Sequence, residues 1–313
     1  MLIPKYKDLY KEFNVKTGMS GRYKLTAIKP DGRERPLTGW FDNLILNSGL
    51  DYKCSYSSTD IIPACQVGTG TSTPTNTQTA LDNRVMGTGT TQSSSSGAQG
   101  SAPYYGHFIK TYRFAAAATN YNLTEVGVGS ASTGGTLVSR ALILDGAGSP
   151  TTVTLLTGEI LDVSYELRMY PGSVAGDYTQ SGVDISGTST TIVSRASSVG
   201  DNTWGTYTVY GLGWAATNSD CTAYNGSLGA VTTVPSGTTG VMTYSSLGSY
   251  STGSYSRSVT FSAGLTVCNF GSGISAVRNR TAAGYYQYSF SPAIMKDSTM
   301  TLALTFNFSW DRV

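Results

Sequence analysis

The stretch GEILDVSYELRMY, residues 158–170, decides the fold class. Its side chains alternate in character along the chain. Leu161, Val163, Tyr165, Leu167 and Met169 fall on one face, and Asp162, Ser164, Glu166 and Arg168 fall on the other. A period of two residues is that of a β-strand with one buried face, whereas an amphipathic helix repeats every 3.6 residues. The stretch is therefore predicted to be a half-buried strand.

The segment MTLALTFNFSW, residues 300–310, repeats the same alternation with larger apolar side chains. The apolar positions of the two stretches coincide when they are shifted by 139 residues, and a looser match at a shift of 147 places Phe114 on Phe261. Such a pattern predicts that each half of the chain contains one long strand of this kind. Common ancestry of the halves and chance both remain open.

The rest of the chain is dominated by strand and turn signals. Pro30-Asp31-Gly32 separates two extended runs, because proline presets φ and glycine accepts a positive φ, so residues 21–40 are predicted to form a β-hairpin. The apolar run at residues 40–53 fits a buried strand or a short helix equally well. Residues 88–103, TGTTQSSSSGAQGSAP, bury too little apolar surface to offset their ordering entropy, so a mobile or partner-held loop is expected there.

These signals predict an all-β protein with two tandem antiparallel β-sandwich domains of jelly-roll type. The predicted divisions are an N-terminal basic arm and hairpin at residues 1–53, a first sandwich at 54–171 and a second at 172–313, with the boundary near Pro171. Residues 1–53 contain ten lysines and arginines against six acidic residues. The arm is therefore expected to anchor each copy, and deletion of the first 20 residues is expected to leave a folded protein.

Composition narrows the classes of function. The chain has 313 residues, and its 21 basic and 19 acidic residues give a net charge of +2, far from the strongly basic balance of a nucleic-acid-binding protein. Four cysteines without C-x-x-C spacing are expected to be buried thiols. The N-terminus lacks the pattern of a secretory signal, and no stretch of 18 apolar residues occurs, so a chain made in the cytoplasm without membrane insertion is expected.

Neither of two catalytic readings is favoured over a structural one. His107 is the only histidine, and it lies among aromatic residues without a G-x-S-x-G motif nearby, so a hydrogen-bonded structural role is expected. Asp162 and Glu166 share one strand face, as a glycosidase pair would, but Arg168 beside them favours a solvated polar face. The chain is thus expected not to be an enzyme and to have no cofactor, catalytic or metal site.

The segment from residue 204 to residue 255 combines aromatic residues with glycine and serine. Amphipathic rings on small-residue loops are typical of recognition surfaces, although cross-strand packing explains most such rings. The candidates for surface recognition are Trp204, Tyr207, Tyr210, Trp214, Tyr224, Tyr250 and Tyr255.

Several segments resemble structural proteins of tailed bacteriophage virions. They are GRYKLTAIKPDGRERPLTGWFDNLILNSGLD (21–51), CQVGTGTSTPTNTQTALDN (65–83), FIKTYRFAAAATNYNLTEVGVGS with LVSRALI, LTGEILDVSYELRMY and the terminal SPAIMKDSTMTLALTFNFSWDRV. The likeness is to tail, tail-fibre or collar proteins and covers roughly residues 21–170 and the C-terminus. It implies a β-rich subunit that is assembled in the bacterial cytoplasm, occurs in repeated copies and lacks catalytic machinery.

The resemblance and the composition together predict a virion structural protein of the tail region. Its expected partners are further copies of itself, other tail or head–tail connector proteins and, at its outer loops, a host-surface glycan or protein. The candidate assembly residues are Lys5, Lys7, Arg22, Lys24, Trp40 and Phe41. A capsid decoration protein and a polysaccharide-degrading tailspike are the alternatives.

Overall fold

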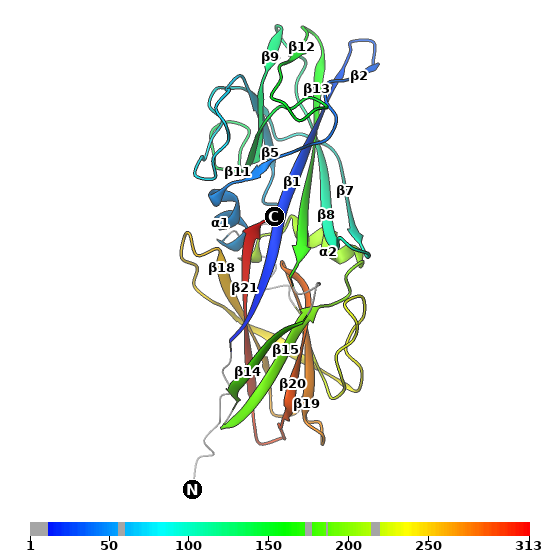
Figure 1. Cartoon of the computed structure of the whole chain (residues 1–313), viewed down its shortest axis with the longest axis vertical. Coiled ribbons are helices and arrows are strands. Elements are labelled where there is room, and N and C mark those ends of the chain that lie inside the picture. The colour runs from blue at the N-terminus through cyan, green and yellow to red at the C-terminus, as the bar shows by residue number, and fades with distance from the viewer. Residues whose placement is uncertain (1–11, 56–59, 173–176, 186, 214–219) are drawn as a thin grey trace.

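The computed structural model describes residues 12–55, 60–172, 177–185, 187–213 and 220–313. The molecule is elongated, and its longest strands run along the long axis (Figure 1). Strands account for 52% of the residues and helices for 6%, so the predicted all-β class is confirmed.

One sheet of fourteen strands extends through the molecule. Its main path contains, in spatial order, β14 (Tyr178–Ile185), β15 (Thr188–Ala196), β20 (Gly284–Ile294), β19 (Ile274–Thr281), β16 (Asp220–Tyr224), β17 (Thr239–Leu247), β18 (Ser256–Ala263), β21 (Leu302–Arg312), β1 (Glu12–Ile28), β13 (Ile160–Pro171), β8 (Tyr105–Arg113) and β7 (Thr91–Gln99). The short strands β2 (Glu34–Pro36) and β3 (Phe41–Asp42) also pair with β1.

The remaining elements are smaller. A five-stranded sheet has the order β4 (Leu44–Ile45), β11 (Leu137–Leu142), β10 (Glu125–Gly129), β5 (Ala64–Gly68) and β6 (Arg84–Thr88). A further pair is formed by β12 (Val153–Leu155) and β9 (Tyr121–Leu123). The helices are α1 (Asn47–Ser55) and α2 (Asn202–Thr208).

Strand β1 joins the two halves of the molecule. Its residues alternate between buried and partly exposed from Val15 to Ile28, as a strand with one core face requires. Thr17–Ile28 pair antiparallel with β13, and Glu12–Met19 pair in parallel with β21 on the other side. One sheet therefore connects strands from the beginning, middle and end of the chain.

The core lies between two layers in each half. In the half that contains the five-stranded sheet, Tyr23 of β1 packs against Tyr165 of β13 at a ring distance of 4.6 Å, and its hydroxyl lies 2.6 Å from Ser139 Oγ of β11. In the other half, Tyr288 of β20 packs against Phe306 of β21 at a ring distance of 4.7 Å. Because four strands separate β20 from β21 in the sheet order, the large sheet must curl over itself there.

The N-terminal arm is not observed as predicted. Residues 12–28 are a central strand of the large sheet, because they pair with β13 on one side and β21 on the other and because the alternating apolar side chains from Val15 to Ala27 are buried. Residues 1–11, the other part of that prediction, lie outside the described residues. The hairpin is confirmed: β1 and β2 pair from Thr26↔Pro36 to Ile28↔Glu34, and Gly32 at φ +82° donates its N–H to the Lys29 carbonyl at 2.9 Å.

Two other segments differ from their sequence-based descriptions. Residues 40–53 contain both of the elements left open, since β3 and β4 are followed by α1. The loop expected at residues 88–103 is wrong over most of its length, because Thr91–Gln99 form β7, whose backbone pairs with β8. Pairing of the backbone on one side replaces the apolar burial that the serine run cannot supply.

The long alternating strands are confirmed. In β13 and β21 the predicted apolar residues from Leu161 to Met169 and from Leu302 to Trp310 are all buried. The two strands flank β1 but run in opposite directions, since β13 is antiparallel and β21 parallel to it.

Candidate functional site

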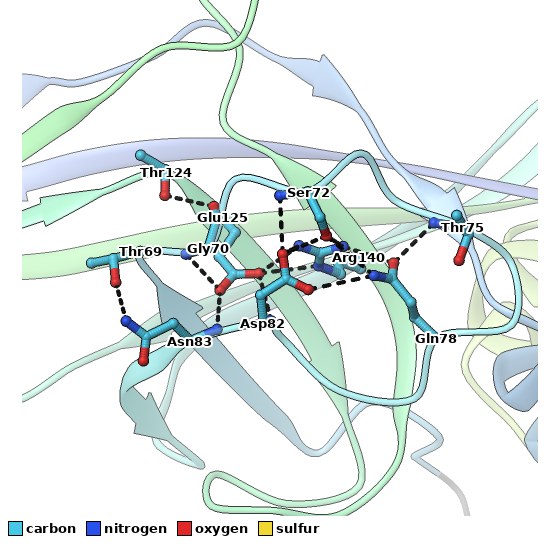
Figure 2. A network of polar contacts seen from close by, with 10 residues as sticks. All are labelled: Thr69, Gly70, Ser72, Thr75, Gln78, Asp82, Asn83, Thr124, Glu125 and Arg140. Carbon is cyan, nitrogen blue, oxygen red and sulfur yellow. Dashed lines mark hydrogen bonds and ion pairs between the residues drawn. The ribbon is translucent and has the colours of Figure 1, made fainter.

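A fully buried ion pair lies between neighbouring strands of the five-stranded sheet. Glu125 comes from β10 and Arg140 from β11, and both side chains are 0% exposed. Arg140 donates to Glu125 Oε2 from Nε at 3.0 Å and from Nη2 at 2.8 Å (Figure 2). Burying two charges is costly unless the remaining polar atoms are also hydrogen-bonded, so the other contacts of this pair indicate its role.

Glu125 fixes both ends of the loop at residues 69–83. Its Oε1 accepts the backbone N–H of Gly70 at 2.9 Å and of Asn83 at 2.8 Å, and its Oε2 accepts that of Asp82 at 3.1 Å. A Cβ at Gly70 would lie 2.5 Å from Glu125 Oε1, so only glycine allows the backbone to approach this closely. One carboxylate thus replaces the ladder partners that the loop backbone lacks.

Arg140 fixes the outer part of the same loop. Its Nη1 donates to Gln78 Oε1 at 2.7 Å, and its Nη2 donates to Asp82 Oδ2 at 2.7 Å. Asp82 in turn accepts the backbone N–H of Ser72 at 3.0 Å. Hydrogen bonds from Ser72, together with the nearby Arg140 guanidinium, lower the pKa of Asp82 below its ordinary value. Both carboxylates are therefore engaged in holding the loop.

The loop presents short polar side chains at a fixed position. Its exposed residues include Thr71, Thr73, Thr75, Asn76 and Thr77. A cavity of about 140 Å³ beside it is lined by Thr71, Thr124, Leu142, Pro150, Thr151 and Thr152. Hydroxyl and amide groups on a rigid backbone suit recognition by hydrogen bonds, because little entropy is lost when a partner binds.

A second buried cation connects α1 to α2. Lys53 is 0% exposed, and its Nζ donates to the carbonyls of Tyr207 at 2.9 Å, Thr208 at 2.9 Å and Tyr210 at 2.7 Å. These carbonyls lie at or just beyond the C-terminal end of α2, where helical acceptors lack intrahelical partners. Lys53 thus joins an element of the first half to one of the second.

The predicted assembly residues that the structure describes do not form one exposed cluster. Arg22 donates from Nε to Glu166 Oε2 at 2.7 Å and lies 4.8 Å from the Trp40 ring centre, while Phe41 is buried. Lys24 is partly exposed on the outer face of β1. Lys5 and Lys7 lie outside the described residues.

Three of the seven aromatic residues predicted to form a recognition surface are buried, so the prediction is wrong for these three. Trp204, Tyr207 and Tyr224 are buried, because α2 and β16 turn these rings into the core. Tyr210, Tyr250 and Tyr255 are partly buried against that core. Trp214 lies outside the described residues. Packing, the interpretation favoured for most of these rings, describes the three buried ones fully and the three partly buried ones in part.

The residues weighed for catalysis also have structural partners. Asp162 accepts two hydrogen bonds from Arg113 at 2.8 and 2.7 Å. Glu166 lies between Arg22 and Arg168 and is 2% exposed, so the expected solvated face is wrong at this position. His107 is partly buried, and its Nδ1 has no hydrogen-bond partner within the described residues, contrary to the expected hydrogen-bonded role; burial lowers the pKa of His107.

Three further features concern the cysteines, possible metal ligands and the length of the helices. Cys54, Cys65, Cys221 and Cys268 are free thiols and are buried, as predicted. In the described part of the chain, no group of three or more His, Cys, Asp or Glu side chains is placed to hold a metal ion. Among the same residues, no helix has the length and apolar character needed to cross a membrane.

Sequence reasoning did not single out Glu125, Arg140 or Lys53. A signal for the first two exists, because each is the single charge in an otherwise uncharged buried strand, EVGVG and LVSRAL, and the charges are opposite. No comparable signal marks Lys53, whose acceptors are carbonyls more than 150 residues away. Comparison with protein families, curated proteins and solved structures found no match to this chain.

Proposed function

We propose that this protein is a structural subunit of the tail region of a tailed bacteriophage virion, present in repeated copies as a tail-fibre, tail or collar component. The proposal depends on one observation, which is that a segment with the resemblance and the loop of the buried ion pair are the same part of the chain. The segment 65–83, whose sequence resembles such proteins, contains the exposed loop that the buried Glu125–Arg140 pair holds in place.

The energetics of this site support a contact role for the loop. If the loop served only to connect β5 to β6, a short turn would be enough, because hairpin connections of two to five residues are sufficient. Here a longer loop is held by a buried ion pair, whose desolvation is costly. Such an arrangement is useful where a neighbouring copy or another tail protein must meet a preformed surface.

The elongated shape of the molecule supports the proposed role as a tail or tail-fibre subunit. We further propose that the two layered halves act as the two tandem sandwich modules, rigidly joined by β1. The outer loops of such a subunit would be the place for contact with a host-surface glycan or protein.

Purified phage particles test the proposal. Mass spectrometry of particles should detect the chain, and electron microscopy with a label at the C-terminus should place it on the tail. Label distributed over the capsid lattice would support the decoration protein instead. Release of reducing ends from host glycans by the purified protein would support the tailspike, and absence of the chain from particles would refute all three.

A further inference from the structure

The free edge of β7 is unusual among the sheet edges of this molecule. This strand is the last of the large sheet, and within the described residues it pairs with β8 alone; it lies on the outer boundary of the molecule in Figure 1. Its sequence is TQSSSSGAQ, and Thr91–Ser95 are exposed. Every second residue of an edge strand directs its backbone N–H and C=O away from the sheet, so this edge can accept another strand.

Natural edge strands usually contain features that block such pairing, and other edges here have them. At the opposite end of the large sheet, β14 has a register shift in its middle, between Gln180 and Val183, and contains Asp184. In the smaller sheet, β6 has five residues and begins with Arg84. Short length, bulges and charges all discourage edge pairing.

None of these features protects the main part of β7. It has nine residues without a charge or a proline, and its register shift lies at its start, between Thr91 and Ser93. The pairing with β8 is regular from Ser93 to Gln99. An edge of this kind is expected to be covered in the functional state of the protein.

We propose that the edge of β7 pairs antiparallel with β7 of a second copy of this chain, about a two-fold axis at Ser95. This inference rests on the proposed multi-copy assembly and names one of its interfaces. In a two-fold contact each residue is opposite its symmetry equivalent. With the axis at Ser95, Ser93 is opposite Gly97 and Ser94 is opposite Ser96 of the second copy.

The composition of β7 favours a second copy over a different partner. A charged strand that meets its own copy places like charges near each other, and like charges directly opposite are destabilising. In β7 the residues around the axis are serines and one glycine, which fit opposite one another and can form hydroxyl hydrogen bonds. A strand that pairs with a different sequence could carry charges, because its partner could place opposite charges across from them.

The inner face of β7 is already occupied, which confines the new contact to the edge. Ser96 Oγ lies 3.3 Å from Asn202 Oδ1 and 3.3 Å from Thr206 Oγ1 of α2. Because side chains alternate along a strand, Ser95 points to the opposite, open face. A substitution at Ser95 therefore probes the proposed contact without disturbing the packing of α2.

Sedimentation velocity and cysteine cross-linking of the full chain test the interface. The wild-type protein should sediment as a dimer, and Ser95→Cys should form a disulfide-linked dimer on oxidation, because facing residues of an antiparallel pair lie within disulfide reach. The native cysteines are buried and should contribute little background. Combined Ser93→Lys and Ser95→Lys should raise the dimer dissociation constant by about tenfold or more.

Matched variants on β14 provide the control. Thr179 is exposed on the other edge strand of the same sheet, so Thr179→Lys should leave the dimer intact and Thr179→Cys should not cross-link. A monomeric wild-type protein, or a dimer that is cross-linked by Thr179→Cys and not by Ser95→Cys, would overturn the inference. A β7 dimer that is absent from phage particles would instead refute the proposed function and leave the interface standing.

Discussion

At the scale of single residues, Glu125 acts on the loop through charge as well as through hydrogen bonds. Replacing it by glutamine keeps its shape but leaves the fully buried Arg140 guanidinium with a weaker set of partners. Removing one partner of a buried pair is strongly destabilising, because the other charge remains desolvated. We expect Glu125→Gln to lower the free energy of unfolding by about 3 kcal/mol in urea denaturation.

An exposed ion pair gives the control for that prediction. Lys16 and Asp311 are 3.2 Å apart, with side chains 72% and 54% exposed. Solvent screens such pairs, so Lys16→Gln should change the free energy of unfolding by less than about 1 kcal/mol. Equal losses in the two variants would contradict the role given to the buried pair.

Residue-scale prediction from the sequence succeeded where a periodic pattern was present. The alternation in residues 161–169 correctly identified the apolar side chains that are buried, because the period of a strand is local information. It could not identify that Glu166 is buried between two arginines, since Arg22 comes from a strand that lies 144 residues earlier in the chain. The prediction of surface exposure for the aromatic residues near 204 was wrong for the same reason, because composition does not show which way a ring points.

At the scale of elements, close backbone contact holds α2 against β7 and β8. A Cβ at Gly205 of α2 would lie 2.2 Å from the Gly97 carbonyl oxygen and 2.7 Å from that of His107. Alanine usually favours a helix over glycine by about 1 kcal/mol. Here we expect the reverse: Gly205→Ala should lower the melting temperature and destabilise the protein by about 1–3 kcal/mol, because the backbone must move apart.

Gly146 offers a matched control for this prediction. A Cβ at Gly146 would have no heavy atom within 4 Å, and its φ is not in the left-handed region. Gly146→Ala should therefore leave the melting temperature unchanged or raise it slightly, since alanine restricts the unfolded chain. A melting temperature for Gly205→Ala as high as that for Gly146→Ala would show that α2 has room to shift.

The pairing of β1 changes the prediction, made from the sequence, that deletion of the first 20 residues leaves a folded protein. Deleting residues 1–11 leaves every described strand pair of β1 in place, whereas deleting residues 1–20 removes the whole parallel ladder between Glu12–Met19 and Thr305–Arg312. The shorter deletion should unfold cooperatively on heating, and so should the full chain, which serves as the reference. The longer one should lose cooperative unfolding, and a sharp transition in that variant would show that the ladder is dispensable.

At the scale of the whole molecule, the sequence patterns did not show which distant strands pair with one another. Strand identity, the hairpin and the all-β class follow from short patterns, but the parallel contact between β1 and β21 joins residues about 290 positions apart. That contact places strands from the beginning, middle and end of the chain in one sheet. The edge strand β7 was missed because its stability comes from backbone pairing with β8 rather than from its own side chains.

The buried thiols and Lys53 predict how stability depends on pH. Burial lowers the pKa of Lys53 to about 7 from 10.5, so between these values the unfolded chain binds more protons and stability rises with pH. Burial raises the pKa of Cys54 from 9.0 to about 12 and also raises the pKa values of Cys65, Cys221 and Cys268. Above pH 9 the unfolded chain therefore loses thiol protons that the folded protein keeps, and stability falls.

Because several cysteines oppose a single lysine, the free energy of unfolding should reach its maximum near pH 9. Each group contributes a slope of up to about 1.4 kcal/mol per pH unit. Urea denaturation at pH 6–11 measures both limbs. Lys53→Met should flatten the rise between pH 7 and 9 but keep the fall above it, because the thiols are unchanged. A rise that survives in this variant would show that Lys53 does not titrate in that range, its proton being held by the three carbonyls of Tyr207, Thr208 and Tyr210.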